Sequence, residues 1–159
     1  MRTLFLTVAA ILALAGCTGK KASTQAEATS SDSITETAVS PIVGEWEIEN
    51  VVINDSLYAR PAEIDTAVKQ YILFNADSTY VVRTNCNTIS GTYMVEGDSI
   101  TLGDGFTTEM ACDNMQVENL IKQVIPEVTA IDFQNDSIVR LNAPSGKHIV
   151  LHKAAERTE

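Results

Sequence analysis

The chain is dominated, from residue 45 onward, by short segments in which polar and apolar residues alternate, with turn-forming clusters between them. In residues 45–49 (Glu-Trp-Glu-Ile-Glu) every second side chain is apolar, which is the period of a strand with one solvated face. Because the separating turns are short, neighbouring strands should pair as antiparallel hairpins. We expect further strands at residues 71–74, 79–83, 89–95, 99–102, 129–133, 138–141 and 147–152.

Four of the turn clusters contain an Asp-Ser pair, at residues 54–56, 76–78, 97–99 and 135–137. Calcium loops concentrate several carboxylates within about a dozen residues, whereas each carboxylate here stands alone. Asn, Gly and Asp accept turn geometry, and Asn and Asp side chains bond nearby backbone groups. We therefore interpret the four clusters as turns and expect no metal at them.

One segment between the strands has the period of a helix. Its apolar stripe consists of Val117, Leu120, Ile121, Val124 and Ile125, the spacing of a helix packed on a core. Asp113 is the expected N-cap, and Pro126 should end the helix. The predicted fold class is therefore α+β, a mostly antiparallel curled sheet or partial barrel with one helix at about residues 114–125 packed across it.

The first residues combine Arg2 with a short apolar run that ends in Leu14-Ala15-Gly16-Cys17. The run from residue 4 to residue 16 is shorter than the roughly 20 residues that a membrane-spanning helix needs. The final four residues resemble the lipobox of bacterial lipoproteins, which implies cleavage before Cys17 and a diacylglyceryl group, with acyl chains such as palmitate, on its thiol. We expect residues 1–16 to be a signal peptide; an ordinary signal peptide without lipidation is the alternative.

The lipobox resemblance also sets the expected location and domain organisation. It implies a lipid-anchored protein of the bacterial cell envelope, and Thr18 after the cysteine favours the outer membrane. Residues 17–40, rich in Ser, Thr, Ala and Glu, cannot bury enough apolar surface to fold and are expected to form a disordered tether. Residues 41–154 should form one monomeric domain, and residues 155–159 a tail.

The formal net charge is −10. A chain this acidic, with scattered basic residues, lacks the patch that neutralises phosphates, so nucleic acid is excluded as a partner. An anionic lipid surface would repel the domain as well. Attachment to the membrane is therefore expected to depend on the acyl chains, each of whose buried methylenes contributes about 0.8 kcal/mol.

A first motif carries a resemblance to a known family. Residues 83–93 (Arg-Thr-Asn-Cys-Asn-Thr-Ile-Ser-Gly-Thr-Tyr) resemble the cysteine–asparagine segment, ending in Gly-x-Tyr, of the META domain (HslJ-like) family. The matching positions include Cys86, Asn87 and Gly91. Asn87 and Gly91 are also explained by backbone shape, because Asn tolerates a left-handed turn and Gly permits a bulge or close packing.

A second motif follows at residues 107–112 (Thr-Thr-Glu-Met-Ala-Cys). It resembles the family's threonine, methionine and cysteine signature before a helix, with Thr108, Met110 and Ala111 among the matching positions. Glu118 falls where the family often has a helical glutamate. Glu109 departs from the pattern, because the family usually has a basic residue there, so a role that needs a positive charge is in doubt.

The resemblance spans roughly residues 44–153 and implies what the domain does. It implies a compact envelope domain linked to stress tolerance and envelope integrity, without a defined enzymatic activity. No catalytic residue can be carried over, so we expect a protein that is not an enzyme. It needs no cofactor, and an unidentified envelope protein could be its partner.

Cys86 and Cys112 are the only thiols that remain once Cys17 carries lipid. In an exported, oxidising setting a disulfide is their expected state, and closing a loop of about 25 residues stabilises a fold by roughly 3 kcal/mol. Two buried reduced thiols are the alternative. No metal site is expected, because the cysteines lack two further donors and His148 and His152, four residues apart on a strand, are separated by about 13 Å.

The start of the first predicted strand leaves a second functional class open, that of a ligand-binding protein. Gly44-Glu45-Trp46 is also typical of lipocalin-like barrels, which bind a small apolar ligand. The helix between the strand groups, and strands that are few for an eight-stranded barrel, argue against this alternative. An apolar cavity of several hundred Å³ would favour the binder. A filled core would exclude it, and its expected members are Trp46, Tyr71, Phe74, Tyr93 and Phe133.

Overall fold

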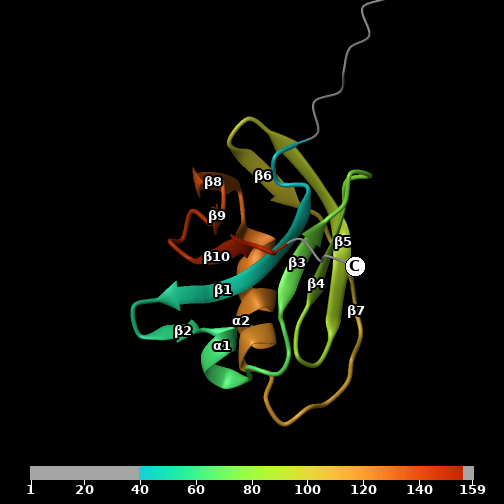
Figure 1. The fold of residues 1–159 in the computed structure, drawn as a ribbon, viewed down its shortest axis with the longest axis vertical. Helices are drawn as coiled ribbons and strands as arrows, with labels where there is room; N and C mark the ends of the chain where they lie inside the picture. Colours follow the sequence, from blue (N-terminus) through green and yellow to red (C-terminus); the bar gives the residue numbers. More distant parts are fainter. Residues whose placement is uncertain (1–39, 156–159) are drawn as a thin grey trace, which may run out of the picture. The chain divides into compact units, whose positions relative to one another are not determined.

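In the computed structural model, which describes residues 40–155, ten strands form one sheet in which every pairing is antiparallel (Figure 1). The predicted signal peptide, the lipidated Cys17, most of the tether and the last four residues lie outside the described residues. The strands are β1 (Gly44–Asn54), β2 (Leu57–Ala59), β3 (Tyr71–Phe74), β4 (Thr79–Arg83), β5 (Thr88–Glu96), β6 (Ser99–Leu102), β7 (Phe106–Thr107), β8 (Ala130–Asn135), β9 (Ile138–Asn142) and β10 (His148–Lys153). The helices are α1 (Pro61–Ile64), α2 (Gln116–Val124) and a 3₁₀ turn, η1 (Ile125–Glu127).

Eight of these strands close into a barrel in the order β10-β9-β8-β6-β5-β4-β3-β1, because β10 also pairs with β1. β1 makes the closure possible: its first residues pair with β3, and residues 46–52 pair with β10 along the other edge. The junction of β6 and β8 is the narrowest, with Ser99 opposite Ala130. The sheet is therefore more closed than the expected partial barrel. The expectation that the strands are too few for an eight-stranded barrel is wrong.

β1 runs five residues beyond the alternation that predicted it. Its register against β10 shifts between Ile48 and Asn50, so Glu49 is the extra residue of a β-bulge. Trp46 and Ile48 are buried before the bulge, and Val51 is buried after it. The bulge moves the buried side chains from even to odd positions, so the sequence shows no continuous period of two across the whole strand.

The four Asp-Ser clusters are turns, as predicted, and each joins two antiparallel strands. The side chains of Asn54, Asp77 and Asn135 each accept a hydrogen bond of 2.9–3.0 Å from the backbone N–H two residues further on. These are the local side-chain bonds expected of turn residues. The clusters therefore set the hairpins that build the barrel wall.

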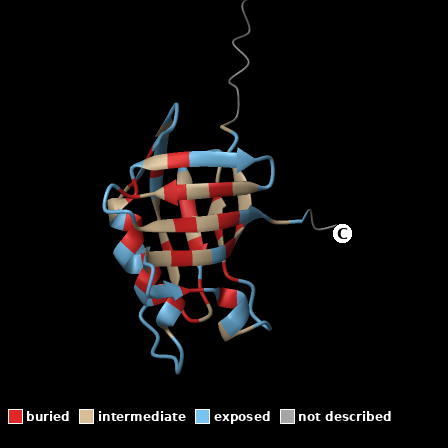
Figure 2. Ribbon diagram, turned by 90° about the vertical axis from the view of Figure 1, so that its left-hand side faces the viewer, coloured by how far each residue is buried: buried red, intermediate tan, exposed pale blue. Residues whose placement is uncertain are grey.

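Side chains of the barrel strands and of α2 share one apolar core, and buried and exposed positions alternate along the strands in Figure 2. Trp46, Phe74 and Tyr93 are buried members of this core. Tyr71 is only partly buried and Phe133 is 38% exposed, so two of the five expected core aromatics lie outside it. Other large, fully buried side chains are Ile72, Tyr80, Ile100, Ile121, Leu141, Ile149 and Leu151.

The predicted helix is confirmed as α2, which lies against β1, β2 and β10 (Figure 1). It begins at Gln116, two residues later than expected, so the proposed N-cap Asp113 is wrong. Asn114 lies nearer, and its Oδ1 accepts a hydrogen bond from Gln116 N (3.2 Å). Pro126 stands inside η1, which continues the chain directly from α2. Among residues 40–155, no helix is long and apolar enough to span a bilayer.

Candidate functional site

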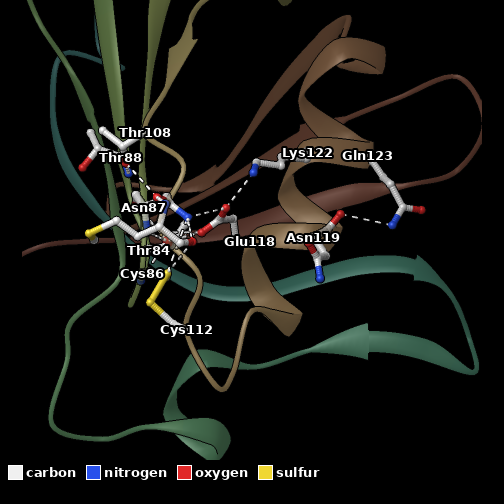
Figure 3. A network of polar contacts seen from close by, with 11 residues as sticks. Thr84, Cys86, Asn87, Thr88, Thr108, Cys112, Glu118, Asn119, Lys122 and Gln123 are labelled. Atoms are coloured by element: carbon white, nitrogen blue, oxygen red, sulfur yellow. Dashed lines mark hydrogen bonds and ion pairs between the residues drawn. A yellow bond between two sulfur atoms is a disulfide. The ribbon is translucent and has the colours of Figure 1, made fainter.

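Glu118, on the first turn of α2, is a fully buried carboxylate that faces the turn between β4 and β5 (Figure 3). Its Oε2 accepts hydrogen bonds from Thr84 Oγ1 (3.0 Å) and Asn87 N (3.2 Å). Its Oε1 accepts from Asn87 Nδ2 (3.0 Å) and Lys122 Nζ (2.6 Å). A buried charge is tolerated only when it is paired and hydrogen-bonded, and these donors meet that requirement.

The electrostatics of Glu118 follow from these contacts. Burial raises the pKa of its carboxyl, but the hydrogen bonds from Lys122, Thr84 and Asn87, with the charge of Lys122, outweigh burial and leave the pKa below its ordinary value. The carboxylate is therefore ionised at neutral pH. A group with a lowered pKa whose oxygens are already occupied is poorly suited to proton transfer near pH 7.

Asn87 is 2% exposed and joins three segments of the chain. Its Oδ1 accepts hydrogen bonds from Thr108 Oγ1 (2.9 Å) and Met110 N (2.8 Å). Its Nδ2 donates to Glu118 Oε1 and to Met110 O (both 3.0 Å). The left-handed backbone expected of Asn87 is wrong, because Ser78 is the only described non-glycine residue with positive φ. The position requires the amide, which provides donors and acceptors on one planar group.

The segment 103–115, which we call the strap, connects β6 to α2 and passes over the β4–β5 turn. A disulfide joins Cys112 on the strap to Cys86 in the turn. This is the oxidised state expected for the pair, and not the alternative of two buried reduced thiols. Thr108 N donates to Thr88 O (3.1 Å), and Thr88 N donates to Thr108 Oγ1 (3.0 Å). After Cys112, Asn114 O accepts a hydrogen bond from Asn85 Nδ2 (2.6 Å), so the strap is hydrogen-bonded on both sides of the disulfide.

The structure brings together most of the motif residues but not all of them. The assembled set is Cys86, Asn87, Thr108, Met110 and Cys112, together with Glu118. Ala111 and Glu109 are exposed on the strap, and Glu109 makes no salt bridge within residues 40–155. The departure at Glu109 therefore leaves the buried network intact.

Gly91 belongs to a different contact. A Cβ at this position would lie 2.8 Å from Gly103 O and 2.8 Å from Cε1 of the Tyr80 ring. Such distances are far below ordinary van der Waals contact. Gly91 thus allows the Tyr80 ring and the end of β6 to approach β5, which agrees with the close packing proposed for it.

Two members of the network were missed by the sequence reasoning. Lys122 lies four residues after Glu118, the spacing of an acidic–basic pair on one helix face, so this signal was present. Thr84 accepts hydrogen bonds from the backbone N–H groups of Cys86 (3.2 Å) and Asn87 (2.9 Å). A threonine that caps a turn in this way is a common local pattern, but it does not indicate a buried carboxylate 34 residues away.

The network holds three chain segments together rather than exposing a reactive group. Its thiols are oxidised, its carboxylate is occupied, and its amide is fully hydrogen-bonded. Lys122 also lines a surface hollow of about 190 Å³ with Tyr80 and Ile125, but its ammonium is paired with Glu118. Among residues 40–155, no group of three or more His, Cys, Asp or Glu residues could hold a metal ion.

Comparisons with known proteins identify a family and solved structures to which the chain is similar. The family model for the META domain matches residues 40–156. A protein from Burkholderia xenovorans, solved by NMR, is similar in fold with a TM-score of 0.59 at 14% sequence identity, over 71% of this chain and 83% of that one. A protein of the DUF4847 family from Bacteroides vulgatus has a TM-score of 0.49 at 11% identity, over 73% and 96% of the two chains. No curated protein matches the sequence.

Proposed function

Because this chain belongs to the META domain family, we propose that it is a non-enzymatic, lipid-anchored protein of the bacterial cell envelope that supports envelope integrity under stress. One observation carries the proposal: the motif residues that meet in space form a buried structural network. An enzyme site would need at least one of these groups to be free to react with a substrate. Here the motif stabilises the barrel and fixes the strap.

The proposed lipid anchor rests on the sequence Leu14-Ala15-Gly16-Cys17. Acyl chains on Cys17 hold the protein to the outer membrane, since the acidic chain gains nothing from anionic lipid headgroups. The barrel then acts as a monomeric, tethered module that contacts an envelope protein.

The lipocalin-like alternative is less well supported. The barrel is closed, as a binder requires, but its inward positions carry large buried side chains such as Trp46, Phe74 and Tyr80. Trp46 also uses its Nε1 to bond Ile42 O (2.7 Å). A hollow of about 470 Å³ does adjoin Trp46 and the half-exposed Phe133. It lies at the end of the barrel and not in the apolar interior that a lipocalin-like ligand would occupy.

The test uses the full chain in its own cells. We expect deletion of the gene to lower survival after heat or detergent stress, and the wild-type chain to restore it. Cys17→Ser should leave the barrel folded but release the protein from the membrane fraction, and restoration should fail. Equal survival with and without the gene, or full restoration by a soluble Cys17→Ser protein, would contradict the proposal.

A further inference from the structure

The two halves of the disulfide differ in exposure. Cys86 is 8% exposed and sits in the β4–β5 turn beside Asn87 (Figure 3), whereas Cys112 on the strap is exposed. A thiolate attacks a disulfide along the sulfur–sulfur axis, and access decides which sulfur is attacked. The exposed side of this bond is the Cys112 side, with Cys86 as the departing sulfur.

Beyond the disulfide, the strap is held by hydrogen bonds and by the short pairing of β7 with β5, and not by a packed apolar core. None of its residues is buried, and two of its apolar side chains, Phe106 (87% exposed) and Met110 (58% exposed), face solvent. Segments with few buried apolar contacts open at low cost. The barrel does not depend on the strap for closure, because β7, the strap's short strand, lies outside the eight-stranded ring.

We propose that the Cys86–Cys112 disulfide is an exchangeable bond, attacked at Cys112 by a dithiol reductant, and that its cleavage opens the strap while the barrel stays folded. The attacking thiolate forms a mixed disulfide with Cys112 and releases Cys86 as a thiolate, which takes up a proton. The second thiol of the reductant then displaces Cys112. The reductant leaves as a disulfide, and the protein keeps two thiols.

Reduction of the folded full chain by dithiothreitol tests the proposal. We expect a rate constant that is proportional to dithiothreitol concentration and that changes less than twofold with urea below the unfolding transition. If reduction required global unfolding, the rate would instead rise with urea according to the full m-value. That result would overturn the proposal.

Hydrogen exchange of the reduced protein tests the second half of the proposal. The amides of Thr108 and Met110 should lose protection at least tenfold, while the amides of β4 and β9 keep theirs. Unchanged protection of the strap, or loss of protection throughout the barrel, contradicts the opening step.

Single-cysteine variants test which sulfur is attacked. In Cys86→Ser the free Cys112 thiol should react with an aromatic disulfide reagent at least tenfold faster than the Cys86 thiol in Cys112→Ser, with peptide mass spectrometry assigning each adduct. Equal rates, or a faster Cys86, would show that the asymmetry is wrong. If either variant fails to fold, a monothiol that traps the mixed disulfide of the wild-type chain decides the question: peptide mass spectrometry should find the adduct on Cys112, and an adduct on Cys86 would overturn the assignment.

Discussion

Asn87 and Glu118 face each other between the β4–β5 turn and α2, and the side-chain amide of Asn87 donates to the Glu118 carboxylate at 3.0 Å. The same amide accepts from Met110 N on the strap at 2.8 Å. One side chain thus links the barrel wall, the strap and the helix.

Replacing Asn87 with Ala should lower the free energy of unfolding by about 2–4 kcal/mol, because it leaves the buried Glu118 and Met110 groups short of partners. Urea denaturation checks this. Asn85→Ala is the matched control: Asn85 is partly exposed and its side chain makes one hydrogen bond, to Asn114 O (2.6 Å), so the loss should stay near 1 kcal/mol or less. Equal losses for the two variants would contradict the role given to Asn87.

Acid should destabilise the wild-type protein through Glu118. Hydrogen bonds and the charge of Lys122 hold the pKa of this carboxyl below its ordinary value of 4.5 in the folded state. Its stabilising contribution is therefore present above pH 4.5 and is lost as the pH falls through the lower, folded-state pKa. We expect Glu118→Gln to be less stable at pH 7 and to lose less stability on acidification. Parallel acid dependence in both proteins, measured by urea denaturation, would show that another group is responsible.

Gly91→Ala should destabilise the barrel by about 1–3 kcal/mol, because the added methyl group overlaps Gly103 O and the Tyr80 ring. Tyr80→Leu removes the ring from this contact. If the ring is the main obstacle, the double variant should be more stable than the sum of the two single losses predicts. Strict additivity in thermal or urea unfolding would place the strain elsewhere.

Trp46→Phe tests how the chain enters the barrel. The indole Nε1 donates to Ile42 O at 2.7 Å, and Ile42 is fully buried. Phe keeps an aromatic ring but leaves this carbonyl without its donor, so we expect a loss of about 1–3 kcal/mol and faster hydrogen exchange at Val43. If the free energy of unfolding falls but hydrogen exchange at Val43 does not change, the loss comes from packing and not from the hydrogen bond to Ile42 O.

The hairpins of the barrel could be predicted because their signals are local. Residues 71–74, 79–83 and 99–102 match β3, β4 and β6, since alternation and turn chemistry act within a few residues. β2, α1 and β7 were not expected, because their two to four residues are too few to show a period. Barrel closure depends on β1 pairing with β10, about 100 residues later in the chain, which no local pattern reveals.

The sequence predicted most residues of the candidate site but not that they form a buried structural network. The two motifs and Glu118 identify residues that meet in space. The sequence does not show that Glu118 is buried, since a glutamate between Val117 and Asn119 could equally face solvent. The predicted N-cap was wrong because α2 begins at Gln116, where Asn114 Oδ1 and not Asp113 accepts the hydrogen bond from the Gln116 backbone N–H.

A double-mutant cycle between Asn87 and Glu118 tests the central claim most directly. The free energy of unfolding would be measured at pH 7 for the wild type, Asn87→Ala, Glu118→Gln and the double variant. If the motif is a structural network, the two sites should couple by about 1–3 kcal/mol. A coupling energy near zero, with each single variant close to wild type in stability, would contradict the account.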